Sequence, residues 1–77
     1  MVTGYILLRL VPGIEKEALQ SLRLIKGVTE VEMVFGHWDA VVKVEAKTIN
    51  ELTRKILSEV RGIQGIGDTE TLVVTEF

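Results

Sequence analysis

Several residue types are scarce in this chain of 77 residues, and each scarcity excludes a class of site. There is no cysteine, so neither a disulfide nor a thiolate metal site reinforces the fold. With one histidine and no cysteine, the chain offers no Ser-His-Asp or Cys-His arrangement for nucleophilic catalysis. Its glycines match neither of the common phosphate-loop patterns. We therefore expect no catalytic residues, no metal and no cofactor.

Neither sign of charge dominates, and long hydrophobic runs are missing too. Nine Lys and Arg against eleven Asp and Glu give a net charge of −2, and the basic residues form no block. Proteins that bind nucleic acid normally carry a basic face, so no direct contact with nucleic acid is expected. No apolar run approaches the roughly 20 residues that span a bilayer, and the N-terminus does not read as a signal peptide. These features predict a cytoplasmic protein without membrane contact.

One short pattern occurs twice along the chain. The segments 22–28 and 57–63 each end a helical pattern with a basic residue, a glycine and an apolar residue, at an offset of 35 residues. Lys26 and Arg61 suit the negative end of a helix. Gly27 and Gly62 suit the left-handed position that follows it. Because an apolar extended run precedes each helix, the repeat predicts two consecutive β-α-β units.

Hydrophobic periodicity predicts four strands and two helices. Strands are expected at 2–11, 28–35, 40–45 and 69–75, and helices at 14–25 and 49–60. Thr48 and Glu51 have the spacing of a capping box, whereas 63–68 is predicted to be a loop or a bulged strand start. Right-handed crossovers place both helices on one face of an antiparallel sheet whose first and third strands are central. This is the ferredoxin-like βαββαβ fold of the α+β class, in a single domain over residues 1–77.

The face of the sheet away from the helices is predicted to be apolar. One copy of the chain cannot cover that face, and large exposed apolar patches usually mark an interface. The simplest partner is a second copy related by a twofold axis, which would give a dimeric α+β barrel. A monomer with a solvated sheet is the alternative. The predicted dimer interface consists of Tyr5, Leu7, Val11, Val41 and Val73.

The connection 36–39 between the two middle strands is a candidate ligand site. Trp38 is the only tryptophan and lies where solvent exposure is expected. Asp39 is able to accept a hydrogen bond from an ammonium group, and a backbone N–H near Gly36 is able to hold a carboxylate. These are the two groups that every α-amino acid carries. By spacing alone, an Asp-stabilised turn with Trp38 over the edge of the core is the simpler explanation of the segment. His37 is likewise more simply a polar loop residue than a metal or haem ligand.

Three segments together resemble a known family. The segment 35–39 and the strand after it resemble the G-x-x-D hairpin in the effector domain of the Lrp/AsnC transcription regulators. The segment 25–28 with Val31 resembles the stretch that enters this hairpin, and 68–74 resembles the family's T-x-T last strand. The resemblance covers essentially the whole chain and implies an effector-binding (RAM) domain. Full-length members carry an N-terminal helix-turn-helix domain, so we expect a stand-alone version that lacks the DNA-binding part.

The resemblance also implies a function and an assembly. Dimers of the family form sheet to sheet and often assemble further into rings such as octamers, and small effectors, typically amino acids, bind where dimers meet. Carried over by position, the effector site comprises Gly36, Asp39, Thr69 and Thr71, with His37 and Trp38 at variable positions. The implied function is non-enzymatic: an amino-acid-sensing and oligomerisation module that modulates full-length Lrp/AsnC regulators.

Two other functions share this topology. A small dimeric α+β barrel enzyme, such as a monooxygenase or an isomerase, holds its substrate between helices and sheet and needs polar side chains there. The positions predicted to face the helices are instead apolar: Ile6, Leu8, Leu10, Val31 and Met33. An amino-acid-binding ACT-like domain has the same strand order but usually joins its sheets edge to edge.

Overall fold

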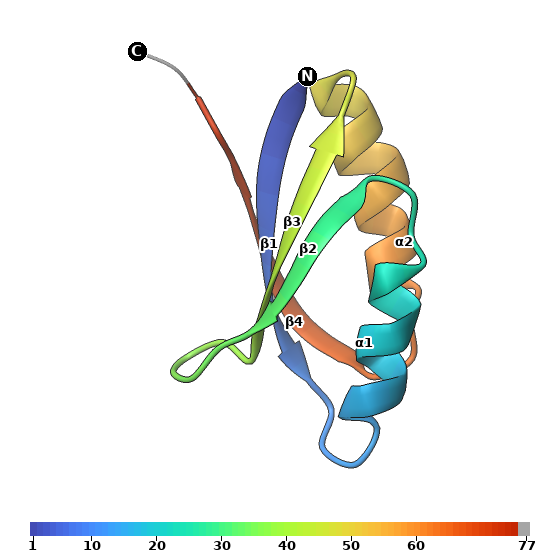
Figure 1. The fold of residues 1–77 in the computed structure, drawn as a ribbon, viewed down its shortest axis with the longest axis vertical. Helices are drawn as coiled ribbons and strands as arrows, with labels where there is room; N and C mark the ends of the chain where they lie inside the picture. Colours follow the sequence, from blue (N-terminus) through green and yellow to red (C-terminus); the bar gives the residue numbers. More distant parts are fainter. Residues whose placement is uncertain (76–77) are drawn as a thin grey trace.

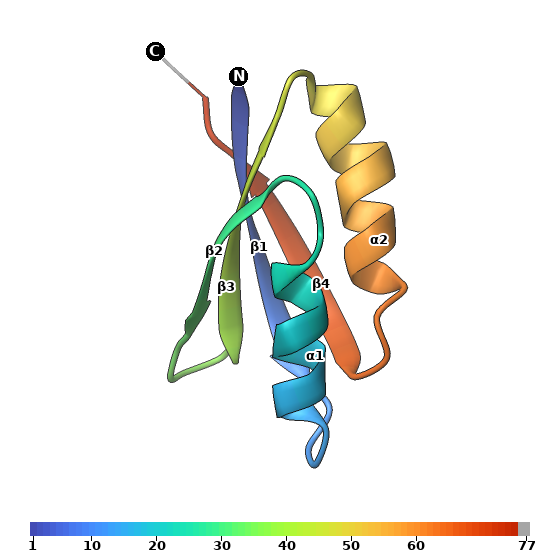
Figure 2. The ribbon, with the colours of Figure 1, turned by 45° about the vertical axis from the view of Figure 1, so that its right-hand side comes forward.

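The computed structural model describes residues 1–75. Its elements are β1 (Val2–Leu10), α1 (Glu15–Arg23), β2 (Val28–Met33), β3 (Ala40–Ala46), η1 (Glu51–Ile56), α2 (Leu57–Arg61) and β4 (Ile66–Val73). The π-helical segment η1 continues directly into α2 as one helical rod (Figure 1). The sheet has the strand order β2-β3-β1-β4, all antiparallel, and the helices cover one of its faces (Figure 2). The predicted ferredoxin-like fold, with the first and third strands central, is confirmed.

The core lies between the sheet and the helices. Alternate residues of the central strands, such as Ile6 and Val42, point toward the helices and are fully buried. The helices bury one apolar stripe each, as the spacings of three and four predict. Three residues represent these stripes: Leu22 of α1, Leu52 of η1 and Val60 of α2. The predicted helix-facing positions Ile6, Leu8 and Leu10 are confirmed as buried core, whereas Met33 is 54% exposed near the hairpin tip.

The internal repeat exists in the structure, but its offset is 38 residues rather than 35. Each helix is followed, four residues after its last residue, by a glycine with positive φ: Gly27 at 103° and Gly65 at 102°. The prediction that Gly62 is left-handed is wrong, because its φ is −79°. Gly62 occupies the C-cap of α2, the position that Leu24 holds after α1. Gly27 and Gly62, which match in sequence, therefore have different structural positions: Gly27 is a left-handed turn residue and Gly62 is a helix C-cap.

Local boundaries follow from turns and bulges. Strand β4 begins at Ile66, inside the predicted loop, and its pairing with β1 shifts register between Leu8 and Leu10. Such a bulge bends the strand and leaves backbone groups unpaired. At the start of the second helix, the N–H of Glu51 donates to Thr48 Oγ1 at 3.0 Å, so the predicted cap is formed. The Glu51 carboxylate accepts from the N–H of Lys47 at 3.5 Å, one residue earlier than a capping box requires.

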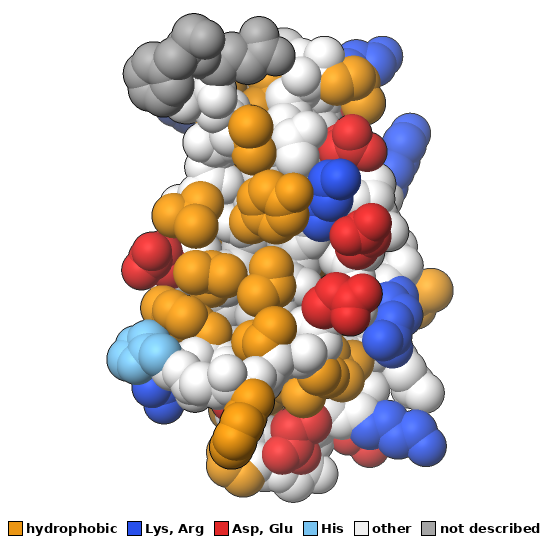
Figure 3. Space-filling model, turned by 60° about the vertical axis from the view of Figure 1, so that its left-hand side comes forward, with side chains coloured by type: hydrophobic (Ala, Val, Ile, Leu, Met, Phe, Trp, Pro, Cys, Tyr) orange, Lys and Arg blue, Asp and Glu red, His pale blue; other side chains and the backbone are white. Residues whose placement is uncertain are grey.

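The face of the sheet away from the helices carries an apolar patch, as predicted. We call this patch the open face; its members are Tyr5, Leu7, Val41, Leu72 and Val74. Tyr5 pairs with Leu72 and Leu7 with Val41. Figure 3 shows hydrophobic side chains running along this face, with charged side chains at its margins. On β2 and β3 the margin includes Glu30 and Lys43, which lie opposite each other.

One predicted interface residue lies on the other side of the sheet. Val73 pairs with Gly4, whose missing Cβ would touch Leu52 of the helical layer, so Val73 faces the helices. The sequence pattern was ambiguous because apolar residues occupy both faces of β4. Val11 follows the end of β1 and is 43% exposed.

Among residues 1–75, no helix is long and apolar enough to cross a membrane.

Candidate functional site

Asp39 ties the β2–β3 hairpin to the end of β1. Its N–H donates to the Leu8 carbonyl at 2.9 Å, and its carbonyl accepts from the Val34 N–H at 3.0 Å. Its carboxylate oxygen Oδ2 accepts from the Leu10 N–H at 2.9 Å in a partly buried position. This N–H lies at the bulge, where β1 changes its register with β4. Asp39 therefore has a structural role, and its other oxygen, Oδ1, has no hydrogen bond within the described part of the chain.

Two aromatic rings of the hairpin loop lie next to Asp39 in the chain, and β1 contributes a cation to the same loop. His37 is exposed, and its ring meets the half-buried Trp38 ring edge to face, with centroids 5.1 Å apart. The Arg9 guanidinium Nη2 donates to His37 Nδ1 at 3.3 Å. Gly36 has a φ of 145° and open space where a Cβ would point.

The two threonines of the predicted site lie across β1 from this loop. Thr69 pairs with Leu8 and Thr71 with Ile6, so both half-buried side chains belong to the helix-covered face of β4. The hairpin residues adjoin β1 from the β3 side, because β1 separates β3 from β4 in the sheet. None of the three clefts described within residues 1–75 is lined by any of the six predicted residues.

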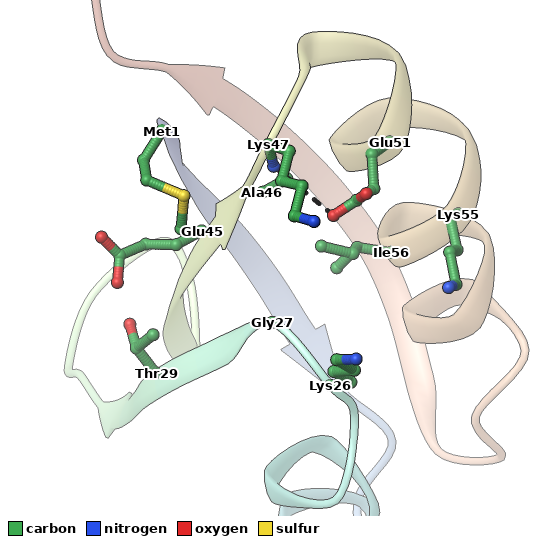
Figure 4. Close-up of a pocket in the computed structure, with 10 residues that line it drawn as sticks. All are labelled: Met1, Lys26, Gly27, Thr29, Glu45, Ala46, Lys47, Glu51, Lys55 and Ile56. Atoms are coloured by element: carbon green, nitrogen blue, oxygen red, sulfur yellow. Dashed lines mark hydrogen bonds between the residues drawn. The ribbon is translucent and has the colours of Figure 1, made fainter.

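Two features of the surface are not apparent from the sequence. Arg9, which interrupts the apolar pattern of β1, adds a cation to the hairpin loop. A cleft of about 370 Å³ also opens at the opposite end of the sheet from the hairpin (Figure 4). Its lining residues come from four separate segments, so no local motif could have revealed it. They are Met1, Lys26, Gly27, Thr29, Glu45, Ala46, Lys47, Glu51, Lys55 and Ile56.

Within residues 1–75, no group of three or more His, Asp or Glu side chains is placed to hold a metal ion.

Comparison with known families decides what kind of domain this is. The sequence profile of the Lrp/AsnC ligand binding domain matches residues 3–77. The chain belongs to the Lrp/AsnC ligand-binding domain family. The resemblance seen in the hairpin and in the last strand is thereby confirmed for the whole domain.

Relatives of this Lrp/AsnC domain occur in two kinds of protein. The HTH-type transcriptional regulator PH1916 of Pyrococcus horikoshii is 36% identical over 74 residues, which are 92% of this chain and 49% of that protein. The chain thus spans about half the length of this relative. The homocitrate synthase of Sulfurisphaera tokodaii is 43% identical over 55 residues, which are 71% of this chain but only 12% of the enzyme.

Solved structures share the complete fold. FFRP-DM1 superposes with a TM-score of 0.89 at 33% identity, covering 97% of this chain and 100% of that chain. AsnC of E. coli superposes with a TM-score of 0.88 at 28% identity, covering 99% of this chain and 52% of that chain.

Proposed function

We propose that this Lrp/AsnC domain binds a small effector, an amino acid, at a site completed by a second copy of the chain, and that binding changes its assembly. The proposal rests on the match of residues 3–77 to the Lrp/AsnC ligand binding domain. The apolar open face, which the helices leave uncovered, supports it. A ligand that binds between subunits is linked to their association by mass action. Such a module signals without catalysis, in keeping with relatives that are transcriptional regulators.

The hairpin loop offers the chemistry that an amino acid requires. Arg9 of β1 contacts the loop at His37, and Asp39 of the loop contacts the end of β1 at the Leu10 N–H. A guanidinium such as that of Arg9 binds a carboxylate through paired N–H donors, and the free Oδ1 of Asp39 is an acceptor for an ammonium group. Trp38 and His37 provide a ring surface next to these charges for the ligand side chain. We propose that Trp38 and His37 determine which amino acid binds.

A second copy is needed because one chain leaves the site unfinished. The predicted threonines lie across β1 from the loop, and the loop lines no cleft described in residues 1–75. The open face supplies a reason for two copies to meet. A standard interface buries about 800 Å² per partner, roughly one sixth of the 5192 Å² surface of this chain. A ring of dimers, and mixed assembly with full-length Lrp/AsnC regulators, extend the same proposal.

The match to part of homocitrate synthase indicates that domains similar to this one occur in enzymes as well as in transcriptional regulators. It covers 12% of the enzyme, so it carries no statement about catalysis by this chain. We propose a non-enzymatic role, without a cofactor, and a cytoplasmic location remains a prediction from composition.

Calorimetric titration of the chain with each of the twenty amino acids tests the effector site. We expect at least one to bind, and binding to weaken more than tenfold in Asp39→Asn, which keeps an acceptor for the Leu10 N–H but removes the charge. Arg9→Gln should weaken the same ligand, whereas Arg23→Gln on the outside of α1 should not. Absence of binding to the wild-type chain, or equal binding to Asp39→Asn, would remove this site.

A further inference from the structure

The cleft at the far end of the sheet gathers lysines from three separate segments. Lys26 comes from the turn between α1 and β2, Lys47 from the residue after β3, and Lys55 from η1. They are three of the five lysines of a chain whose net charge is −2. All three side chains are exposed, and Figure 4 shows them on different sides of the opening. This concentration of positive charge is local and is not a property of the whole surface.

The floor of the cleft is apolar and rigidly held. The buried residues Ala46 and Ile56 line it together with Gly27. The Gly27 carbonyl accepts from the Glu45 N–H at 2.8 Å, which fixes the turn against β3. A Cβ on Gly27 would lie 2.6 Å from Ile56 Cδ1 and 3.1 Å from the Glu45 carbonyl oxygen, at a φ of 103° that favours glycine. The volume of about 370 Å³ falls within the range of roughly 300–1,000 Å³ typical of small-molecule sites.

The internal repeat provides a comparison within the same chain. At the offset of 38 residues, Gly65 corresponds to Gly27, and its carbonyl likewise accepts a backbone N–H, from Val11, at 2.8 Å. A Cβ on Gly65 would meet Ile14 Cδ1 at 3.0 Å and Ala18 Cβ at 3.2 Å, and Ala18 corresponds to Ile56. Each turn therefore places a positive-φ glycine against a helix and hydrogen-bonds its carbonyl to a backbone N–H of a distant segment.

The lysines are absent from the second turn of this pair. Gln64 takes the place of Lys26, and Glu17 takes the place of Lys55. Arg9 takes the place of Lys47 but does not line the second cleft. Both Gln64 and Glu17 line a cleft of about 490 Å³ there, which has no cationic side chain in its lining. Since the turn forms equally well with a neutral and an acidic residue, its geometry does not require lysines. The positive charge at the first turn calls for another explanation.

The helix beside the lysines is also unusual. Residues Glu51–Ile56 form a π-helical segment, and three of them line the cleft: Glu51, Lys55 and Ile56. π-Helical turns are rare and are found frequently at functional sites. The corresponding residues of the first repeat are 13–18, of which 15–18 lie in the regular α-helix α1. Two departures from the repeat, in charge and in helix type, thus coincide at one cleft.

Two carboxylates also belong to the lining and limit its charge. The Glu51 carboxylate accepts a hydrogen bond from the backbone N–H of Lys47, so it is partly engaged. The Glu45 side chain extends away from Ile56 and the lysines in Figure 4. Three lysines against these two glutamates leave the lining with one net positive charge.

We propose that this cleft is a second ligand site, which binds a small organic phosphate. Lysine binds phosphate as a point charge, and three lysines around one opening suit a phosphate monoester, which carries close to two negative charges at pH 7. The cleft contains lysines and no arginine. Lys26, Lys47 and Lys55 hold the phosphate oxygens at the rim, and the organic part rests on Ala46 and Ile56. The site lies at the opposite end of the sheet from the hairpin loop and is independent of the effector site proposed above.

A titration with glycerol 3-phosphate, followed by the amide resonances of the chain, tests the site. We expect the amides of Gly27, Ala46 and Glu51 to shift and those of 36–39 to stay in place. Lys26→Gln and Lys55→Gln should each weaken binding about threefold to fivefold, the scale of an exposed ion pair. Added salt should weaken binding further, because exposed charges are screened.

Two controls decide the outcome. Lys16→Gln removes an exposed lysine of α1 that does not line the cleft, and it should leave binding unchanged. Succinate has carboxylates in place of phosphate and should bind more weakly than glycerol 3-phosphate. No amide shift in the cleft, or equal weakening by Lys16→Gln, would overturn the site. Equal affinity for succinate would overturn its assignment to phosphate.

Discussion

Replacing Asp39 by alanine should destabilise the domain strongly. The substitution removes the only described acceptor of the Leu10 N–H, which Asp39 Oδ2 binds at 2.9 Å in a partly buried position. Leaving a buried donor unpaired costs about 1–3 kcal/mol. A domain of this length has a total stability of roughly 4–12 kcal/mol, at about 0.05–0.15 kcal/mol per residue. One side chain in the hairpin thus holds a large share of the stability.

Thermal unfolding measures this effect directly. For a domain of this size each kcal/mol shifts Tm by about 4–8 °C, so a loss near 2 kcal/mol lowers Tm by roughly 8–16 °C. Asp39→Asn keeps a neutral acceptor and should lose less than about 1 kcal/mol. Asp68→Ala, which removes an exposed carboxylate of β4, is the matched control and should change little. Protein concentration must be held constant, because association shifts Tm. An Asp39→Ala variant that melts with the wild type would refute the structural role.

Two further substitutions test the turn and the cap. Gly27→Ala places a Cβ at a φ of 103° and 2.6 Å from Ile56 Cδ1. Chemical denaturation should therefore show a loss of about 1–3 kcal/mol in the free energy of unfolding. Gly13→Ala, at a φ of 99° in open space, should lose less stability, and equal losses would contradict the proposed overlap. Thr48→Ala removes the acceptor of the first helical N–H and should cost about 1 kcal/mol. Thr48→Ser keeps the hydroxyl and should restore most of that stability.

Much of the fold was predictable because its signals are local and repeat along the chain. Strict alternation in β3 and apolar spacings of three and four in the helices place the core residues correctly. The sequence suggests an offset of 35 because Gly27 and Gly62 both follow a basic residue, whereas the structural offset is 38. In the structure the left-handed φ belongs to Gly65, and Gly62 is an ordinary C-cap. Local sequence identity is therefore a weaker guide to equivalence than the position of a turn relative to its helix.

The face of an edge strand is decided by pairing and not by pattern alone. On β4 apolar residues occupy both faces, so only the pairing of Val73 with Gly4 reveals that Val73 points toward the helices. The same limit applies to the site. The sequence pointed to Asp39 through a hairpin motif, but the acceptor role toward Leu10 depends on a bulge in a distant strand. The lysines of the cleft come together only through the topology of the sheet and the helices.

Sedimentation equilibrium at micromolar concentration tests most directly whether the open face is an interface. We expect the wild-type chain to sediment as a dimer or a larger multiple of its 8.6 kDa subunit. Leu72→Lys, which places a charge at a residue that is 47% exposed on the open face, should sediment as a single subunit with its fold intact. A wild-type particle of 8.6 kDa would contradict the account, because a site shared between two copies cannot then exist.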